Sequence, residues 1–286
     1  MSNLFPNAAV EAFGRAYPAQ IARLTHSLVG HPLFTLEAIG ELAAHMDPAD
    51  LEHNAALDLP MGIANADIPS NALSVQETIH TIERNGSWVL LKKIQQLPAY
   101  REILDRALGE LADPIVLRTG MALRPDAYLF ISSPEAITPL HFDPDYNILA
   151  QLRGSKTMTL FPTDDPEMVP QQFQERYFGG GSRNLHWEER FGGRGRPFDL
   201  HPGDAIYVPI LAPHHVKVHG DYSVSLSLTW RSVWSHHHAD ACRFNRRLRG
   251  LGLDPARPRL YPRDNRLKSV AERALLRADR ALGRTP

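Results

Sequence analysis

The spacing of apolar residues divides the chain into a helical, a strand-rich and a second helical region. In the first region, residues 1–113, apolar side chains recur at steps of three and four, which is typical of amphipathic helices. Ser74 and Glu77 have the spacing of a capping box, a pair that begins many helices. We expect this region to be mainly helical and to pack on the next one. The predicted helices cover residues 8–28, 36–46, a segment beginning at Ser74, and 98–111.

The second region, residues 114–234, contains short apolar runs separated by Gly and Pro, a pattern that indicates strands. Many short strands of this kind are typical of a mainly β barrel or sandwich. One long interruption at residues 164–202 is rich in Gly, and loops of this length are often functional or mobile. The predicted strands cover residues 115–117, 128–131, 147–152, 156–161, 205–208, 214–218 and 222–230.

The third region, residues 235–286, is predicted to form two basic helices at residues 239–251 and 265–282. From residue 231 onward the chain has 14 Lys and Arg against 5 Asp and Glu, or +9, so the −1 of the whole chain leaves −10 for the rest. A basic tail can bind nucleic acid, but Arg-rich helices more often have one solvated face, so nucleic acid is the less favoured partner. An apolar stripe from Leu267 to Leu282 predicts a face covered either by the chain's own N-terminal helices or by a second copy, and we expect a homodimer through these helices.

Composition narrows the possible chemistry and location. With 286 residues and 43% hydrophobic residues, the chain can bury a large core. We find no apolar run of about 18 residues for a membrane span and no signal-peptide core near the N-terminus, so we expect a cytoplasmic protein without a membrane partner. The single cysteine, Cys242, cannot form an internal disulfide or a thiolate site by itself. Any metal must therefore be held by His, Asp or Glu.

His141 and Asp143 are two residues apart, so on an extended chain both side chains point to one face. Strand alternation places His214 on the apolar face of a later strand, while His215 and His219 fall on the polar face. Two histidines and one carboxylate form a facial triad that leaves open positions on Fe(II) for an oxoacid and O2. We predict His141, Asp143 and His214 as metal ligands, with His215 as the alternative histidine, and we expect the run His236–His238 to be a helix-start or surface feature.

These residues resemble the JmjC-type, cupin-like Fe(II)- and 2-oxoglutarate-dependent dioxygenases. The layout is similar to that of the asparaginyl hydroxylase acting on hypoxia-inducible factor. The resemblance covers roughly residues 126–231 and rests on three motifs in order. It implies a double-stranded β-helix, or jelly-roll barrel, flanked by N-terminal and C-terminal helices. The motifs are Thr138-Pro139-Leu140-His141-Phe142-Asp143, Asn147 to Pro162, and Pro202 to Pro209 leading to His214.

The resemblance also implies a cosubstrate site. In that family a lysine and a threonine hold the far carboxylate of 2-oxoglutarate, and Lys156 and Thr138 occupy those positions here. Asn147 matches an asparagine near the cosubstrate. Thr229 stands where the asparaginyl hydroxylase has a contacting asparagine, which is a departure. The residues agree with this assignment, because Lys156 is predicted to share an interior face with Met158 and would need an anionic partner there.

The implied activity is that of a hydroxylase, with N-demethylation as a variant, using Fe(II), 2-oxoglutarate and O2. The primary substrate is expected to be a protein or peptide side chain, with a small molecule as the alternative. Two other classes of protein remain open. One is a cupin that binds a metal without oxygen chemistry, and the other is a non-catalytic module that binds nucleic acid through its basic tail.

Overall fold

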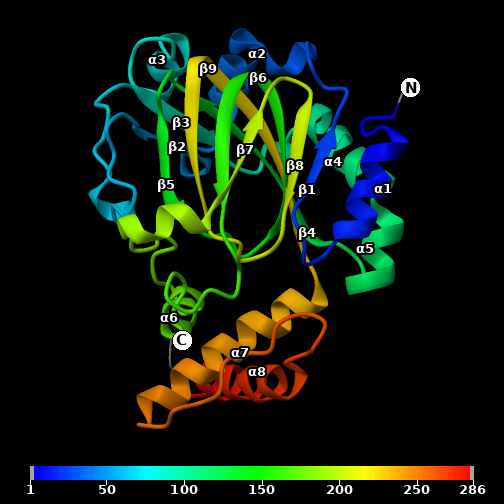
Figure 1. Ribbon diagram of the computed structural model, residues 1–286, viewed down its shortest axis with the longest axis vertical. Coiled ribbons are helices and arrows are strands. Elements are labelled where there is room, and N and C mark those ends of the chain that lie inside the picture. Colours follow the sequence, from blue (N-terminus) through cyan, green and yellow to red (C-terminus); the bar gives the residue numbers. More distant parts are fainter. Residues whose placement is uncertain (1–2, 284–286) are drawn as a thin grey trace.

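The computed structural model describes residues 3–283, and its centre is one curled antiparallel sheet (Figure 1). Hydrogen-bonded neighbours follow the order β1-β8-β6-β9-β4-β3-β2, while β5 pairs with β9 and β7 pairs with β6. The expected jelly-roll fold with flanking helices is confirmed. Within the described residues the two outermost strands do not pair with each other, so the sheet is not a closed barrel. The strands are β1 (Ala22–Thr25), β2 (Leu51–Ala55), β3 (Ser87–Leu91), β4 (Leu123–Ser132), β5 (Ile137–His141), β6 (Tyr146–Leu160), β7 (Arg196–Leu200), β8 (Asp204–Val208) and β9 (His214–Arg231).

The two long strands, β6 and β9, run side by side through the whole sheet and bend together. Each was expected to be two separate strands, and each is continuous. The bend in β6 lies at a bulge, where the register with β9 shifts between Gln151 and Ser155. Gly154 has φ of +65°, and a Cβ atom there would lie 2.2 Å from the carbonyl oxygen of Tyr222. Only glycine therefore fits this position without displacing the neighbouring strand.

The helices cover the sheet on one side and at both ends (Figure 1). Helix α1 lies beside β1, and its Phe13 contacts Tyr207 and Trp230 in the core. Helices α7 and α8 lie together beyond one end of the sheet. The helices are α1 (Asn7–Ala16), α2 (Leu36–Ala44), α3 (Val75–His80), α4 (Pro98–Glu110), α5 (Ala112–Thr119), α6 (Gln171–Phe178), α7 (Val233–Gly250) and α8 (Arg266–Ala281). Short 3₁₀ helices cover Pro32–Phe34, Pro48–Asp50, Asn65–Asp67, Ile94–Gln96 and Glu189–Arg194.

Several predicted elements are correct. Ser74 begins α3 with a complete capping box, because its side chain accepts from the backbone N–H of Glu77 and the Glu77 carboxylate accepts from that of Ser74. Helices α2 and α4 lie at or near their predicted positions. The two C-terminal helices are also confirmed, although α7 begins earlier than predicted, at Val233. Local sequence signals were sufficient for these elements.

Three predicted elements are wrong. The helix expected over residues 8–28 ends at Ala16, just before Pro18, and residues 22–25 form β1. The strand expected at residues 115–117 lies inside α5, whose first turn accommodates Pro114. A three-residue apolar run has too little periodicity to separate strand from helix. The interruption at residues 164–202 contains α6 and β7, so it is not a structureless loop.

Residues 1–113 also contribute β1, β2 and β3 to the sheet, which makes this region less helical than expected. These strands complete both ends of the sheet order, with β1 at one end and β3 and β2 at the other. The division of the chain near residues 113 and 234 stays a prediction. Among residues 3–283, no helix has both the length and the apolar content to span a lipid bilayer.

Candidate metal centre and adjoining cavity

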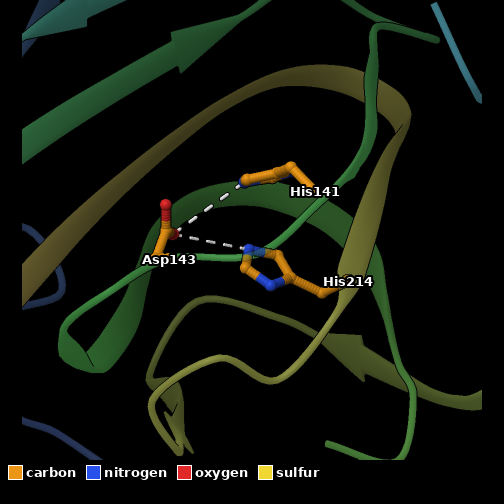
Figure 2. A group of neighbouring side chains, drawn as sticks. All are labelled: His141, Asp143 and His214. Atoms are coloured by element: carbon orange, nitrogen blue, oxygen red, sulfur yellow. Dashed lines mark ion pairs between the residues drawn. The ribbon is translucent and has the colours of Figure 1, made fainter. Parts of the chain in front are cut away.

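His141, Asp143 and His214 meet where two strands end. His141 is the last residue of β5 and pairs directly with His214, the first residue of β9. Oδ2 of Asp143 lies 3.9 Å from Nε2 of His141 and 3.7 Å from Nε2 of His214 (Figure 2). One ligand atom from each residue lies within 4.8 Å of the others, so the three side chains could hold one metal ion.

Backbone carbonyls fix the orientation of both imidazoles. Nδ1 of His141 donates to the carbonyl of Pro139 at 2.8 Å, and Nδ1 of His214 donates to that of Ala212 at 2.9 Å. Each ring therefore carries its proton on Nδ1 and turns the Nε2 lone pair toward Asp143. Figure 2 shows the two rings pointing at the carboxylate from neighbouring strands.

The protonation states suit a divalent cation. Burial lowers the pKa of His141 to about 3 and also lowers the pKa of His214, so both rings are neutral at physiological pH. Burial by itself would raise the pKa of Asp143, but Arg183 and the two imidazoles lower it to about 2. Two neutral nitrogens and one ionised oxygen are donors that bind Fe(II) and related metals without releasing protons first.

A cavity of about 360 Å³ adjoins the three side chains. It contains all four residues predicted for the cosubstrate, which come from three strands: Thr138, Asn147, Lys156 and Thr229. The structure therefore brings every predicted site residue to one place. The cavity is also lined by Glu52, Asn65, Leu90, Lys92, Tyr128, Phe130, Ser132, Pro144, Asp145, Leu149, Met158, Tyr177, Arg183, Val216, Ser227 and Arg231.

Lys156 is a buried cation without a partner. Its side chain is only 4% exposed, and it makes no hydrogen bond or ion pair with any residue between 3 and 283. Burial lowers the pKa of Lys156 from 10.5 to about 7, since no neighbouring charge offsets the loss of water. An isolated ammonium in such a place is costly unless an anion joins it, so this end of the cavity is suited to a carboxylate.

The bulge in β6 brings Asn147 and Lys156 to the same cavity. The two residues are separated by an odd number of positions, so in a regular strand they would face opposite sides of the sheet. Leu149 lies on the cavity face before the bulge and Met158 after it. The register shift at Gly154 therefore reverses the parity between them.

Asn147 and Thr229 are direct cross-strand neighbours. Oδ1 of Asn147 accepts a hydrogen bond from Ser227 at 2.8 Å, which fixes the amide so that its nitrogen can donate. The hydroxyl of Thr229 donates to the carbonyl of Asp126 at 3.2 Å and keeps its lone pairs. Both side chains present polar atoms to the cavity.

His215 and His219 point away from the cavity. The ring of His215 packs against Phe161 and Trp187, and His219 is hydrogen-bonded to Thr157 at 2.8 Å. This arrangement agrees with the choice of His214 from strand alternation.

Residues outside the predicted motifs also line the cavity. Glu52 and Lys92 come from near β2 and β3, and Tyr177 and Arg183 come from α6 and the segment after it. The only signal for Arg183 was its position just after Gly179–Gly181, in the interruption predicted to be functional. Loops lack a period that would give the direction of one side chain. The run His236–His238 lies at the start of α7, as expected, although His238 is buried and stacks on Trp234 and so is not at the surface.

Several solved structures have a similar fold. Two structures of YcfD from Escherichia coli match with TM-scores of 0.51, at 14% and 15% identity. They cover 93% and 96% of this chain and 67% of YcfD, which is described as a ribosomal oxygenase. A third YcfD structure, with cobalt and 2-oxoglutarate, has the same TM-score at 14% identity and covers 96% of this chain and 67% of YcfD. At these identities the similarity shows the fold alone.

No curated protein sequence matches the chain. Residues 81–236 match the family model described as the Cupin-like domain, and they include β4 to β9 with the three metal-binding candidates. The match covers more than half of the 286 residues, and the curled sheet is the fold expected of such a domain. The chain therefore belongs to the Cupin-like domain family.

Proposed function

We propose that this protein is an Fe(II)- and 2-oxoglutarate-dependent oxygenase. The observation that carries the proposal is the unpaired, buried ammonium of Lys156 in the same cavity as His141, Asp143 and His214. A ligand with an oxoacid at one end and a carboxylate at the other can satisfy both the metal and the lysine. The YcfD structure with cobalt and 2-oxoglutarate supports the same pair of ligands for this fold.

The polar side chains that line the cavity suggest a role for each residue in this reaction. His141, Asp143 and His214 would hold the iron, and Lys156 with Thr138 would bind the far carboxylate of 2-oxoglutarate. Asn147 and Thr229 would add hydrogen bonds from the same wall of the cavity. When bound, iron and 2-oxoglutarate supply the activation of O2 for oxidation of a C–H bond. The protein orients these groups and keeps water out of a cavity walled by the sheet.

Hydroxylation is the proposed outcome, and N-demethylation is its variant. A protein or peptide side chain is the proposed primary substrate, with a small molecule as the alternative. The description of YcfD as a ribosomal oxygenase supports a protein substrate. The expected cytoplasmic location also stays a prediction.

The two rival classes have less support. A metal-binding cupin without oxygen chemistry gives no reason for a buried, unpaired Lys156 beside the metal ligands. A nucleic-acid-binding tail has less support because four of its arginines, Arg243, Arg247, Arg249 and Arg273, are already in ion pairs within the protein. Most of the paired charge holds α6, α7 and α8 together.

In helix α8 the polar face is buried and the apolar face is exposed, which is the reverse of the usual arrangement. Its buried residues are polar, because Ser269 donates to Asp240 at 2.7 Å and Glu272 pairs with Arg247 at 2.8 Å. Its apolar stripe faces outward, with Leu267 89% exposed and Val270 61% exposed. The N-terminal helices do not cover this stripe, so internal packing does not explain it.

We propose that the stripe on α8 packs against a second copy of the chain. Leu275 and Leu282 extend it along the same face as Leu267, and both are exposed. In a two-fold symmetric dimer the same face of each subunit meets its counterpart, so the apolar stripes of two copies would cover each other. Arg277 and Arg280 lie at its sides and could face the acidic body of the other subunit, which carries −10 in residues 1–230.

We expect a visible charge-transfer band when Fe(II) and then 2-oxoglutarate are added to the protein without oxygen. The band arises only if the oxoacid chelates the iron, so it separates the oxygenase from both rivals. Asp143→Ala and His214→Ala should remove the band and the decarboxylation of 2-oxoglutarate, while circular dichroism shows an intact fold. His215→Ala is the matched control and should keep both. Loss in the His215 variant with retention in the His214 variant would reverse the ligand assignment.

Lys156→Ala should raise the dissociation constant of 2-oxoglutarate roughly tenfold or more, because a charge-assisted hydrogen bond contributes about 1.5–3 kcal/mol. Iron affinity should change little. Lys92→Ala is a suitable control, since Lys92 lines the same cavity but already pairs with Glu52. Titrations that give the same 2-oxoglutarate affinity for Lys156→Ala and the wild type would remove Lys156 from the site.

The same lysine predicts a pH dependence. The pKa of Lys156 is lowered to about 7 in the free protein, so above that pH its ammonium group loses its proton. Binding of the 2-oxoglutarate dianion then requires Lys156 to take up a proton. The affinity for 2-oxoglutarate should therefore fall as the pH rises from about 7 to 9, by up to roughly tenfold per pH unit. Lys156→Ala should lose this dependence.

Light scattering should give the wild-type protein about twice the chain mass of 32.0 kDa. The double variant Leu267→Glu/Leu275→Glu should be a monomer, because two carboxylates would be buried unpaired in the interface. Leu117→Glu, on the exposed side of α5, is the control and should stay dimeric. A wild-type protein that runs as a monomer would rule out the dimer.

A further inference from the structure

The two carboxylate oxygens of Asp143 have different neighbours. Oδ2 faces Nε2 of His141 and Nε2 of His214, at 3.9 Å and 3.7 Å. Oδ1 accepts a hydrogen bond from Nη1 of Arg183 at 2.9 Å. We infer that Arg183 is a positioning residue that makes Asp143 bind the metal through one oxygen only. This inference rests on the proposed function.

The number of oxygens that Asp143 offers decides how much room remains at the metal. Carboxylates bind metal ions through one oxygen or through both. Two imidazoles and one carboxylate oxygen leave three positions of a six-coordinate ion open. A chelating 2-oxoglutarate needs two of these and O2 needs the third, so a second oxygen from Asp143 would take a position that the reaction requires. A donor that occupies Oδ1 prevents this.

The chain ties Arg183 to the metal-binding strand. Asn184, the next residue, forms a β-bridge with His141, so its backbone is fixed to the end of β5. The side-chain amide of Asn184 also donates to the carbonyl of Ile63 at 2.9 Å. The backbone of Arg183 is therefore held next to the residues that its side chain serves, which is what a positioning role requires.

Arg183 also differs from the other cations of the cavity. Arg231 pairs with Asp145 at 2.5 Å, and Lys92 pairs with Glu52, so both have acidic partners outside the metal group. Of the lining cations among residues 3–283, Arg183 alone contacts a metal-ligand candidate. Its side chain is 37% exposed, so an ordinary ion pair would be weakened by water. If the ion pair between Arg183 and Asp143 also sets how Asp143 binds the metal, its loss should change ligand binding, which can be measured separately from the stability of the protein.

If Arg183 positions Asp143, its loss should change the affinities for metal and for 2-oxoglutarate differently than if it only supports the fold of the site. Absorption titrations with Co(II) measure both affinities. Arg183→Gln removes a cation and frees Oδ1, so Co(II) should bind as tightly as in the wild type or more tightly. The Co(II)-loaded variant should bind 2-oxoglutarate roughly tenfold or more weakly, the size of effect typical of residues that orient metal ligands. Arg183→Lys, which keeps a charged donor, should recover part of the 2-oxoglutarate affinity. Arg231→Gln removes a cation from the same cavity without touching Asp143 and should change that affinity much less.

Weaker Co(II) binding in Arg183→Gln with unchanged 2-oxoglutarate affinity would overturn the inference, because Arg183 would then only support the fold of the site. Equal losses in Arg183→Gln and Arg231→Gln would also overturn it and assign the effect to charge. If the wild-type protein binds Co(II) but no 2-oxoglutarate, the proposed function fails separately. In that case the Co(II) absorption spectrum of the metal-loaded protein tests the positioning role. Identical spectra for the wild type and Arg183→Gln would overturn it.

Discussion

The antiparallel pairing of His141 with His214 is the constraint on which the rest of the site depends. It places the end of β5 against the start of β9, so two imidazoles from distant parts of the sequence lie side by side. Two backbone carbonyls then fix the ring orientations. Asp143 follows β5 by only two residues and lies opposite both rings, and the backbone N–H of the buried Leu211 donates to its carbonyl at 2.9 Å. The metal centre is a product of strand register more than of side-chain packing.

The opposite end of the cavity has a different energetic character. At the metal end, burial lowers the pKa of His141 and keeps its imidazole neutral, whereas Arg183 and the two imidazoles outweigh burial and keep the Asp143 carboxylate ionised. At the Lys156 end, burial acts alone and leaves a side chain whose charged state is poorly stabilised. Side chains whose pKa is shifted in this way are concentrated at functional sites. At such a site the bound ligand can supply the stabilisation that the charged side chain lacks in the free protein.

The sequence predicts where the candidate metal ligands lie better than it predicts the elements around them. Strands have a period of two, so the directions of His141 and His214 could be inferred from alternation, and Asp143 follows His141 on an extended segment. The same argument fails for Arg183, because a loop has no period. It also fails for α8, where the apolar stripe was recognised but ion pairs, not apolar contacts, hold the helix to α7. Short segments such as residues 115–117 carry too few positions to distinguish helix from strand.

The bulge at Gly154 makes the length of one segment part of the chemistry. Asn147 and Lys156 face the same cavity only because the chain between them contains one residue beyond the regular count. Without that residue the regular alternation of the strand would turn Lys156 and Met158 away from the cavity. Relatives of this chain can therefore vary in composition between these two positions more easily than in length. In an alignment of such relatives, a gap at this point would mark a protein whose lysine no longer faces the cavity.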